Sequence, residues 1–175
     1  MSQLSLLPGE VMIGGADFSE DRVYRYLLWR SWDSTKPWVG FICLNPSTAD
    51  EKDPDQTLTR LINFSKSWGY GGLLLGNLFA FRTPYTEVLH DAWKGRGREA
   101  IDVVGERNNN ALLKIAREAQ RLVVAWGAPV WVEPRAEEVG RLLVGTSFWC
   151  IRKTAGGAPE HPLYLPGHLE AARWP

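Results

Sequence analysis

Three side chains in this sequence have the chemistry of a binding or catalytic site, and each follows a strand-like apolar run. Asn45 and Asn77 come directly after two such runs, and His161 follows the last run after a loop. A side-chain amide is both donor and acceptor, so it can position a water molecule or match the edge of a nucleobase. A neutral imidazole N–H can stabilise developing negative charge. We interpret Asn45 and His161 as candidate catalytic residues and Asn77 as a candidate binding residue.

Neighbouring residues extend this group. Ser47 and Thr48 can offer hydroxyl or backbone N–H groups to an anion, and Gly127 would let a ligand approach the backbone because it has no side chain. Each signal also has a structural interpretation, since Asn-Pro is a common turn dipeptide and Trp-Gly can be a tight turn between a strand and a helix. The flanking candidates for binding are Pro46, Ser47, Thr48, Trp126 and Gly127.

Strand and helix patterns alternate along the chain and must position these residues. Apolar runs predict strands and 3.6-residue periodicity predicts helices, with Asp55 as one N-cap and Pro134 in the first turn of a later helix. The expected strands span residues 23–30 (in an N-terminal hairpin), 38–44, 73–79, 121–125 and 147–151. The expected helices lie between Asp55 and Gly69, after Thr83-Pro84, and at residues 109–119, 133–144 and 167–173.

Crossovers long enough for helices favour a parallel sheet covered on both faces. We therefore predict an α/β fold with three α/β/α layers around a central, mainly parallel four-stranded sheet. Residues 1–175 are expected to form a single domain on which an N-terminal β-hairpin extension, residues 1–37, packs. The carboxyl ends of parallel strands line one crevice, so both amides, His161 and the Trp126-Gly127 turn are expected to meet in one pocket.

The composition is that of an ordinary globular protein, with 45% hydrophobic and 23% charged residues. Lys plus Arg equals Asp plus Glu at 20 each, which argues against strong non-specific binding to duplex DNA. Cys43 and Cys150 lie in apolar runs and are expected to be buried, reduced thiols, and two cysteines cannot supply the four ligands of an iron–sulfur cluster. No signal peptide or membrane-spanning stretch is evident. We expect a cytoplasmic protein, monomeric and without a cofactor.

The sequence contains no GxGxxG, P-loop, HExxH or GxSxG motif, which disfavours nicotinamide enzymes, P-loop hydrolases, zincins and serine hydrolases. An acidic segment comprises Asp50, Glu51, Asp53 and Asp55, but it lacks the spacing and glycine of a calcium loop. We interpret it as a solvated loop that ends in a helix cap and predict no metal ligand, although a metal site at Asp50 or Asp53 remains an alternative.

The segments LNPSTAD, WGYGGLLLGNLFAFR, VAWG and HPLYLP resemble a bacterial and phage family known as domain of unknown function 1643, over residues 24–165. This resemblance implies no established activity. The chain differs from the family pattern at two places: Gln56 stands in a segment that tends to read Asp-Pro-Thr, and Asn109 stands where Asn-Asp tends to precede a helix.

The same signatures, in the same order, more remotely resemble the uracil-DNA glycosylase superfamily. That resemblance implies a similar sheet, with Asn45 positioning water, Asn77 recognising the base and His161 stabilising the departing base. Phe79 or Phe81 would stack on the base. The positive side chains that would then contact phosphate are Arg82, Lys94, Arg96, Arg98 and Lys153.

These observations predict a protein that binds a nucleobase or nucleotide, with single-stranded or damaged DNA as a candidate partner. Its activity would be that of a DNA glycosylase-like hydrolase that cleaves the N-glycosidic bond of a damaged or modified base. Two alternatives remain open. One is a non-catalytic nucleotide- or nucleic-acid-binding module, and the other is a metal-dependent enzyme that acts on a different bond of a nucleotide.

Overall fold

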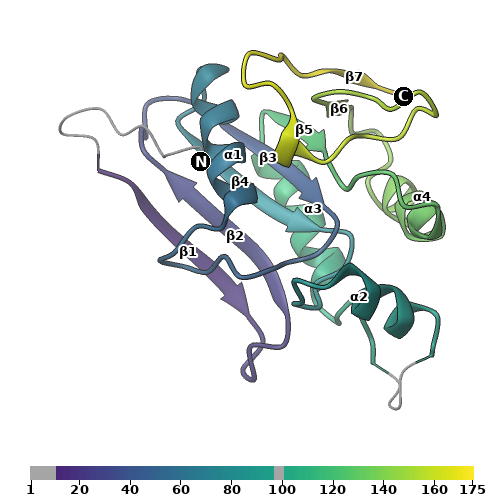
Figure 1. Cartoon of the computed structure of the whole chain (residues 1–175). Coiled ribbons are helices and arrows are strands. Elements are labelled where there is room, and N and C mark those ends of the chain that lie inside the picture. The colour runs from purple at the N-terminus through teal and green to yellow at the C-terminus, as the bar shows by residue number, and fades with distance from the viewer. Residues whose placement is uncertain (1–10, 97–100) are drawn as a thin grey trace.

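A computed structural model describes residues 11–96 and 101–175 and contains one mixed sheet between two layers of helices (Figure 1). The strands of the described residues are β1 Ile13–Phe18, β2 Arg25–Ser31, β3 Trp38–Cys43, β4 Gly72–Asn77, β5 Arg121–Val124, β6 Phe148–Cys150 and β7 Ala172–Trp174. The helices are α1 Gln56–Ser67, α2 Thr86–Trp93, α3 Asn108–Glu118 and α4 Glu133–Leu142, with short 3-10 helices η1 Val130–Val132 and η2 Pro162–Tyr164.

The seven strands follow the order β1-β2-β4-β3-β5-β6-β7. The predicted α/β class is confirmed, and the four strands β4, β3, β5 and β6 pair in parallel. The sheet is wider than the predicted four strands because both flanks add antiparallel partners. The N-terminal hairpin joins it through pairing of β2 with β4, and β7 pairs with β6 at the far edge.

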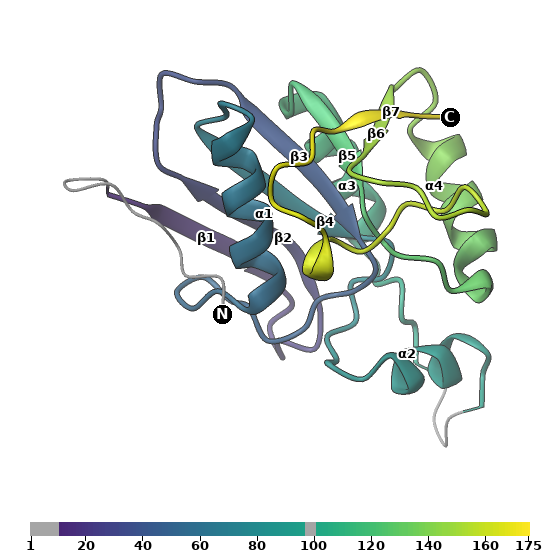
Figure 2. The same cartoon turned by 45° about the horizontal axis from the view of Figure 1, so that its top comes forward.

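Helix α1 covers one face of the sheet and α3 the opposite face, as the two views show (Figures 1 and 2). Alternate residues of the strands therefore enter two separate cores. Phe41, Leu73 and Val123 belong to the core under α1, whereas their sequence neighbours Ile42, Leu74 and Leu122 belong to the core under α3 and α4. This burial on both faces explains why the central strands read as continuous apolar runs rather than alternating ones.

The local sequence explains the positions of helices α1 and α3. Asp55 caps α1 as predicted, because its carboxylate accepts a 2.8 Å hydrogen bond from the backbone N–H of Leu58. Helix α3 packs very close to the sheet over two glycines. A Cβ atom at Gly40 or Gly76 would lie only 2.7 or 2.6 Å from a side-chain atom of Ile115. Glycine at these two strand positions thus permits the close approach of α3.

Two predicted helices differ from the structure. The helix expected at residues 167–173 is wrong, because this segment ends in β7, whose Trp174 packs edge-on against Trp126 and Phe148. Pairing with β6 outweighs the weak local helix signal. Helix α2 begins at Thr86 rather than at Pro84, since the Thr83 hydroxyl accepts from the Tyr85 N–H in a turn that precedes the helix.

The structure also bears on the two cysteines and on membrane-spanning helices. Cys43 and Cys150 are free and buried, as expected. Within residues 11–96 and 101–175, no helix is long and apolar enough to span a membrane.

Candidate functional site

A polar cavity of about 360 Å³ opens at the carboxyl ends of β3 and β4. We call it the amide cavity. Three of the sequence-predicted residues that follow separate strands, namely Asn45, Asn77 and His161, line it, as does Ser47. Its other lining residues are Arg25, Cys43, Leu44, Asp55, Thr57, Leu75, Thr83, Pro84, Thr86 and Leu163.

The Asn45 amide is held by its nitrogen. Nδ2 donates to the backbone carbonyls of Thr83 at 2.8 Å, Pro46 at 3.0 Å and Phe81 at 3.4 Å. The Thr83 N–H in turn donates to the Pro46 carbonyl at 3.0 Å, which links the two segments. Three carbonyl acceptors fix which end of the amide is nitrogen. Asn45 lines the cavity, and within residues 11–96 and 101–175 no protein group donates to its side-chain oxygen, which is left as an acceptor.

The Asn77 amide is held at its other end. Its side chain is only 2% exposed, and Oδ1 accepts a 3.4 Å hydrogen bond from the Arg25 guanidinium. Asn108, at the start of α3, fixes the backbone here by donating from Nδ2 to the carbonyls of Asn77 and Leu78, both at 3.0 Å. In the described parts of the chain, Asn77 Nδ2 donates no hydrogen bond within the protein. Asn77 therefore offers a donor to a ligand in the amide cavity.

His161 contributes an imidazole whose tautomer is set by the backbone. Nδ1 accepts a 3.3 Å hydrogen bond from the Leu163 N–H at the start of η2, so the proton of the neutral ring lies on Nε2. The ring keeps solvent contact, but the surrounding protein still desolvates it enough to lower its pKa, and the Asp55 carboxylate opposes this only in part. A neutral His161 with a free Nε2–H is therefore the dominant form at pH 7.

Arg25 lies beneath the amide cavity on β2 and is 3% exposed. It donates to the Ala49 carbonyl at 2.8 Å as well as to Asn77. Burial lowers the pKa of this guanidinium to about 10, with Asp55 acting in the opposite direction. At neutral pH it stays charged, so it is a positively charged support for the Asn77 oxygen.

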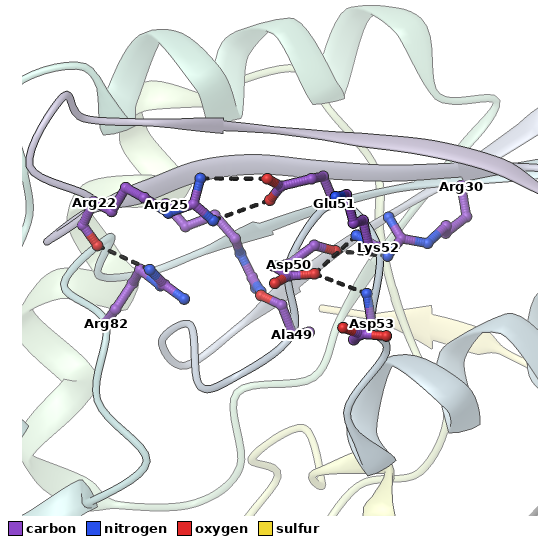
Figure 3. Close-up of polar contacts among 9 residues, drawn as sticks. All are labelled: Arg22, Arg25, Arg30, Ala49, Asp50, Glu51, Lys52, Asp53 and Arg82. Atoms are coloured by element: carbon purple, nitrogen blue, oxygen red, sulfur yellow. Dashed lines mark hydrogen bonds and ion pairs between the residues drawn. The ribbon is translucent and has the colours of Figure 1, made fainter.

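The loop that carries the acidic segment is fastened by arginines to β2 and to the turn that precedes it (Figure 3). Arg30 donates to the Asp50 carbonyl at 2.6 Å, next to the bond from Arg25 to Ala49. Arg22 pairs with the Glu51 carboxylate at 3.0 Å. These contacts explain how a loop with many acidic residues lies against the sheet and delivers Asp55 to the cavity wall.

The Asp50 carboxylate is occupied by its own loop. Oδ1 accepts from the backbone N–H groups of Lys52 at 2.8 Å and Asp53 at 2.7 Å, and these hydrogen bonds lower the Asp50 pKa (Figure 3). The described residues contain no group of three or more His, Cys, Asp or Glu side chains that could hold a metal ion. The alternative of a metal site at Asp50 or Asp53 gains no support from this geometry.

Five other predicted residues do not line the amide cavity. Phe79 is fully buried in the core between Trp93 and Trp131, so it cannot stack on a ligand. Phe81 packs edge-on against Tyr24. Pro46 is buried and Thr48 is exposed, and neither lines the cavity. Arg82 donates to the Arg22 carbonyl at 2.9 Å and does not line the cavity either.

Trp126 and Gly127 line a different cavity of about 690 Å³, which we call the tryptophan cavity. It lies between the end of β5, helix α4, the loop after β6 and β7, and its walls include Phe148, Pro159 and Trp174. The prediction that all four strand-end signatures meet in one pocket is therefore wrong for the Trp-Gly turn. The two cavities are nevertheless neighbours, because a Cβ at Gly127 would lie 3.8 Å from the Cβ of His161.

The remaining predicted phosphate contacts lie on the surface. Lys94, Arg96 and Lys153 are exposed and do not line the amide cavity. Arg98 lies outside the described residues.

Residues 25–163 match the model of a protein family described as a protein of unknown function, DUF1643. The chain belongs to the DUF1643 family. No curated protein and no solved structure matches it. The structure gives both places where the sequence was expected to differ from the family pattern a clear setting. Asp55 and Thr57 flank Gln56 and line the amide cavity, and the Asn109 oxygen accepts a 2.7 Å hydrogen bond from buried Arg135.

Sequence reasoning missed Arg25 and Asn108 as supports of the site. Arg25 lies in a predicted strand and Asn108 next to the start of a predicted helix. When such polar side chains are buried, they need hydrogen-bond partners. Arg25 sits among Tyr26, Leu27 and Leu28, where a buried arginine is unexpected. The charged side chain of Arg25 inside an apolar strand-like segment was the signal that could have identified it from the sequence.

Proposed function

We propose that the amide cavity binds a nucleobase, free or within a nucleotide or DNA, and that the protein hydrolyses the N-glycosidic bond of a damaged or modified base. One observation carries the proposal. Asn45, Asn77 and His161 are each fixed at one polar atom by protein groups, so that their second polar atoms remain for a ligand. The volume of about 360 Å³ falls within the range of small-molecule sites.

The orientation of Asn77 favours a base that carries an oxo group. Because Arg25 donates to Oδ1, the amide presents mainly N–H donors, which pair with a carbonyl oxygen rather than with an exocyclic amine. The Nε2–H of His161 is a second donor in the same cavity. Two donors favour bases such as uracil, hypoxanthine or xanthine.

The proposed reaction requires little proton transfer by the protein. The Asn45 oxygen accepts a hydrogen bond from water and orients it toward the sugar C1′ atom. The C1′–N bond breaks with its electron pair going to the base, the water oxygen bonds to C1′, and the proton released by the water ends on the departing base. The Nε2–H of His161 stabilises the negative charge that develops on a base oxygen, as an oxyanion-hole donor does.

A non-catalytic binding module is the second candidate. Asn45 is an amide and cannot take a proton from water, and one Asp55 oxygen is engaged as a helix cap. This favours binding without turnover if no other group activates the water.

The test is base release from single- and double-stranded oligonucleotides that contain uracil, hypoxanthine, xanthine or an alkylated base, read out by alkaline cleavage. We expect release to fall about 100-fold or more in Asn45→Ala and His161→Ala. His168→Ala is the matched control, because His168 is exposed and does not line the cavity. Base binding measured by calorimetry, without release from any substrate, would identify the binding module, and neither binding nor release would overturn the proposal.

A further inference from the structure

The tryptophan cavity is separate from the amide cavity, and the proposed function does not use it. At about 690 Å³ it exceeds the amide cavity and falls within the range of small-molecule sites. Few polar side chains line this cavity, and most of its walls are aromatic or apolar.

Aromatic rings form one corner of this cavity. Trp174 stands nearly perpendicular to Trp126, at 87° with ring centroids 5.4 Å apart, and nearly perpendicular to Phe148, at 82° and 6.3 Å. The Trp174 indole N–H donates to the Gly157 carbonyl at 3.0 Å, so its polar atom is satisfied and the ring is held in place. The faces of aromatic rings carry negative electrostatic potential, so aromatic rings in a cavity wall attract cations.

The charges on the walls have one sign. Glu133 and Glu137 on α4 line the cavity, and no Lys, Arg or His does so. Glu137 also lies 3.8 Å from Arg141, but both side chains are more than 70% exposed, and such a pair is only weakly attractive in water. An anionic group such as phosphate would therefore be disfavoured here, so the cavity is poorly suited to extend a nucleotide site.

The remaining wall is apolar and suits the body of the ligand. Val132, Ala136 and Pro159 line it, and Val130 is 77% exposed beside them. We propose that the tryptophan cavity is a binding site for a small organic cation with an apolar body, such as an alkylated or aromatic ammonium compound.

The test uses benzyltrimethylammonium as the probe, with benzyl alcohol as the neutral comparison and phenylacetate as the anionic one. Calorimetric titration of the full chain is expected to show binding of the cation about fivefold tighter than of the neutral compound, with the anion weakest. The indole N–H signals of Trp126 and Trp174, assigned by substitution, should shift with the cation.

Charge-removing variants locate the site. Glu133→Gln and Glu137→Gln should each weaken binding of the cation by about threefold without changing binding of the neutral compound. Glu118→Gln is the matched control, because Glu118 is an exposed glutamate on α3 that does not line the cavity.

Other results would overturn the proposal. These are equal affinity for the three probes, no binding of any probe at millimolar concentration, or loss of cation binding in Asn45→Ala, which would place the cation in the amide cavity. None of these readouts requires base release, so the result is independent of the proposed function.

Discussion

The amide cavity and the tryptophan cavity lie next to each other and are built in opposite ways. In the amide cavity, the orientation of each polar side chain depends on hydrogen bonds to backbone groups or to Arg25. In the tryptophan cavity, most of the wall is aromatic or aliphatic, and the rings are held by edge-to-face packing and by one hydrogen bond from Trp174 to a backbone carbonyl. The segment from Pro159 to His161 separates them, with Pro159 on one side and His161 on the other.

This difference shows where specificity can arise in each cavity. Hydrogen bonds fix direction, so the amide cavity can distinguish an oxo group from an amine. Packing and ring potential depend on shape and charge, so the tryptophan cavity can distinguish a cation from an anion of similar size. Four predictions test the amide-cavity side of this contrast, and the expected effects decrease in the order given.

The largest expected effect is on stability, through Asn108, which fixes the backbone at the end of β4 beside the amide cavity. Asn108→Ala removes both hydrogen bonds to the carbonyls at the end of β4 and should lower the free energy of unfolding by about 2 kcal/mol. Asn110→Ala, two residues further along α3 and exposed, should change it by less than about 0.5 kcal/mol. Urea unfolding measures both. Equal effects would mean that the buried asparagine does not support the cavity.

The second perturbation compares two arginines of β2 that are both 3% exposed. Arg25→Met should weaken ligand binding in the amide cavity about tenfold, because Asn77 loses the charged donor that fixes its orientation. Arg30→Met should have a much smaller effect, since Arg30 holds the acidic loop but does not line the cavity. The side-chain amide signals of Asn77 provide a readout that needs no ligand. Similar losses of ligand affinity in both variants would mean that the position of the acidic segment, rather than the orientation of Asn77, controls binding.

The third prediction concerns pH. Burial lowers the pKa of His161 below its ordinary value of about 6.5, so the neutral ring with its Nε2–H persists at pH 7 and is lost only on acidification below that range. The unfolded chain takes up this proton first, so stability should also fall as pH drops below about 6.5. NMR titration of the imidazole measures the pKa. A His161 pKa above 6.5, or an acid limb in the activity profile that persists in His161→Gln, would contradict this assignment.

The smallest expected effect is on thiol reactivity. Cys43 lines the amide cavity, but it is only 4% exposed and burial raises its pKa to about 12. In Cys150→Ser protein, labelling of Cys43 by an uncharged disulfide reagent should therefore proceed no faster than unfolding. Rapid labelling of the folded protein would mean that the cavity opens much more widely.

Continuous apolar runs predicted much of the fold because the central strands are buried on both faces. The parallel pairing of β3, β4, β5 and β6, the capping of α1 by Asp55 and the burial of both cysteines are confirmed. The terminal segment was predicted wrongly, because β7 is three residues long and depends on pairing with β6 and packing of Trp174. Contacts between distant segments leave no periodic pattern in so short a stretch.

The strand-end rule predicted that Asn45, Asn77 and His161 would lie together, and all three line one cavity. The rule could not place Phe79, whose direction depends on how the chain turns after β4, nor the Trp-Gly turn, which lies one strand further along the sheet. It also could not find Arg25. That residue is the first of β2, which runs antiparallel to β4, so it comes to the same edge of the sheet from the start of a strand rather than from a carboxyl end.

The C-terminal segment is fastened to the first helix over a long stretch of sequence. Arg60 donates to the Leu165 carbonyl, and the Trp68 indole N–H donates to the Leu169 carbonyl at 2.9 Å. During synthesis on the ribosome, α1 and the strands beside it emerge well before these partners. The face of α1 that receives them stays uncovered until then, and the segment that carries His161 can dock on α1 only after Leu165 and Leu169 have emerged. The amide cavity is thus completed well after α1 itself has emerged.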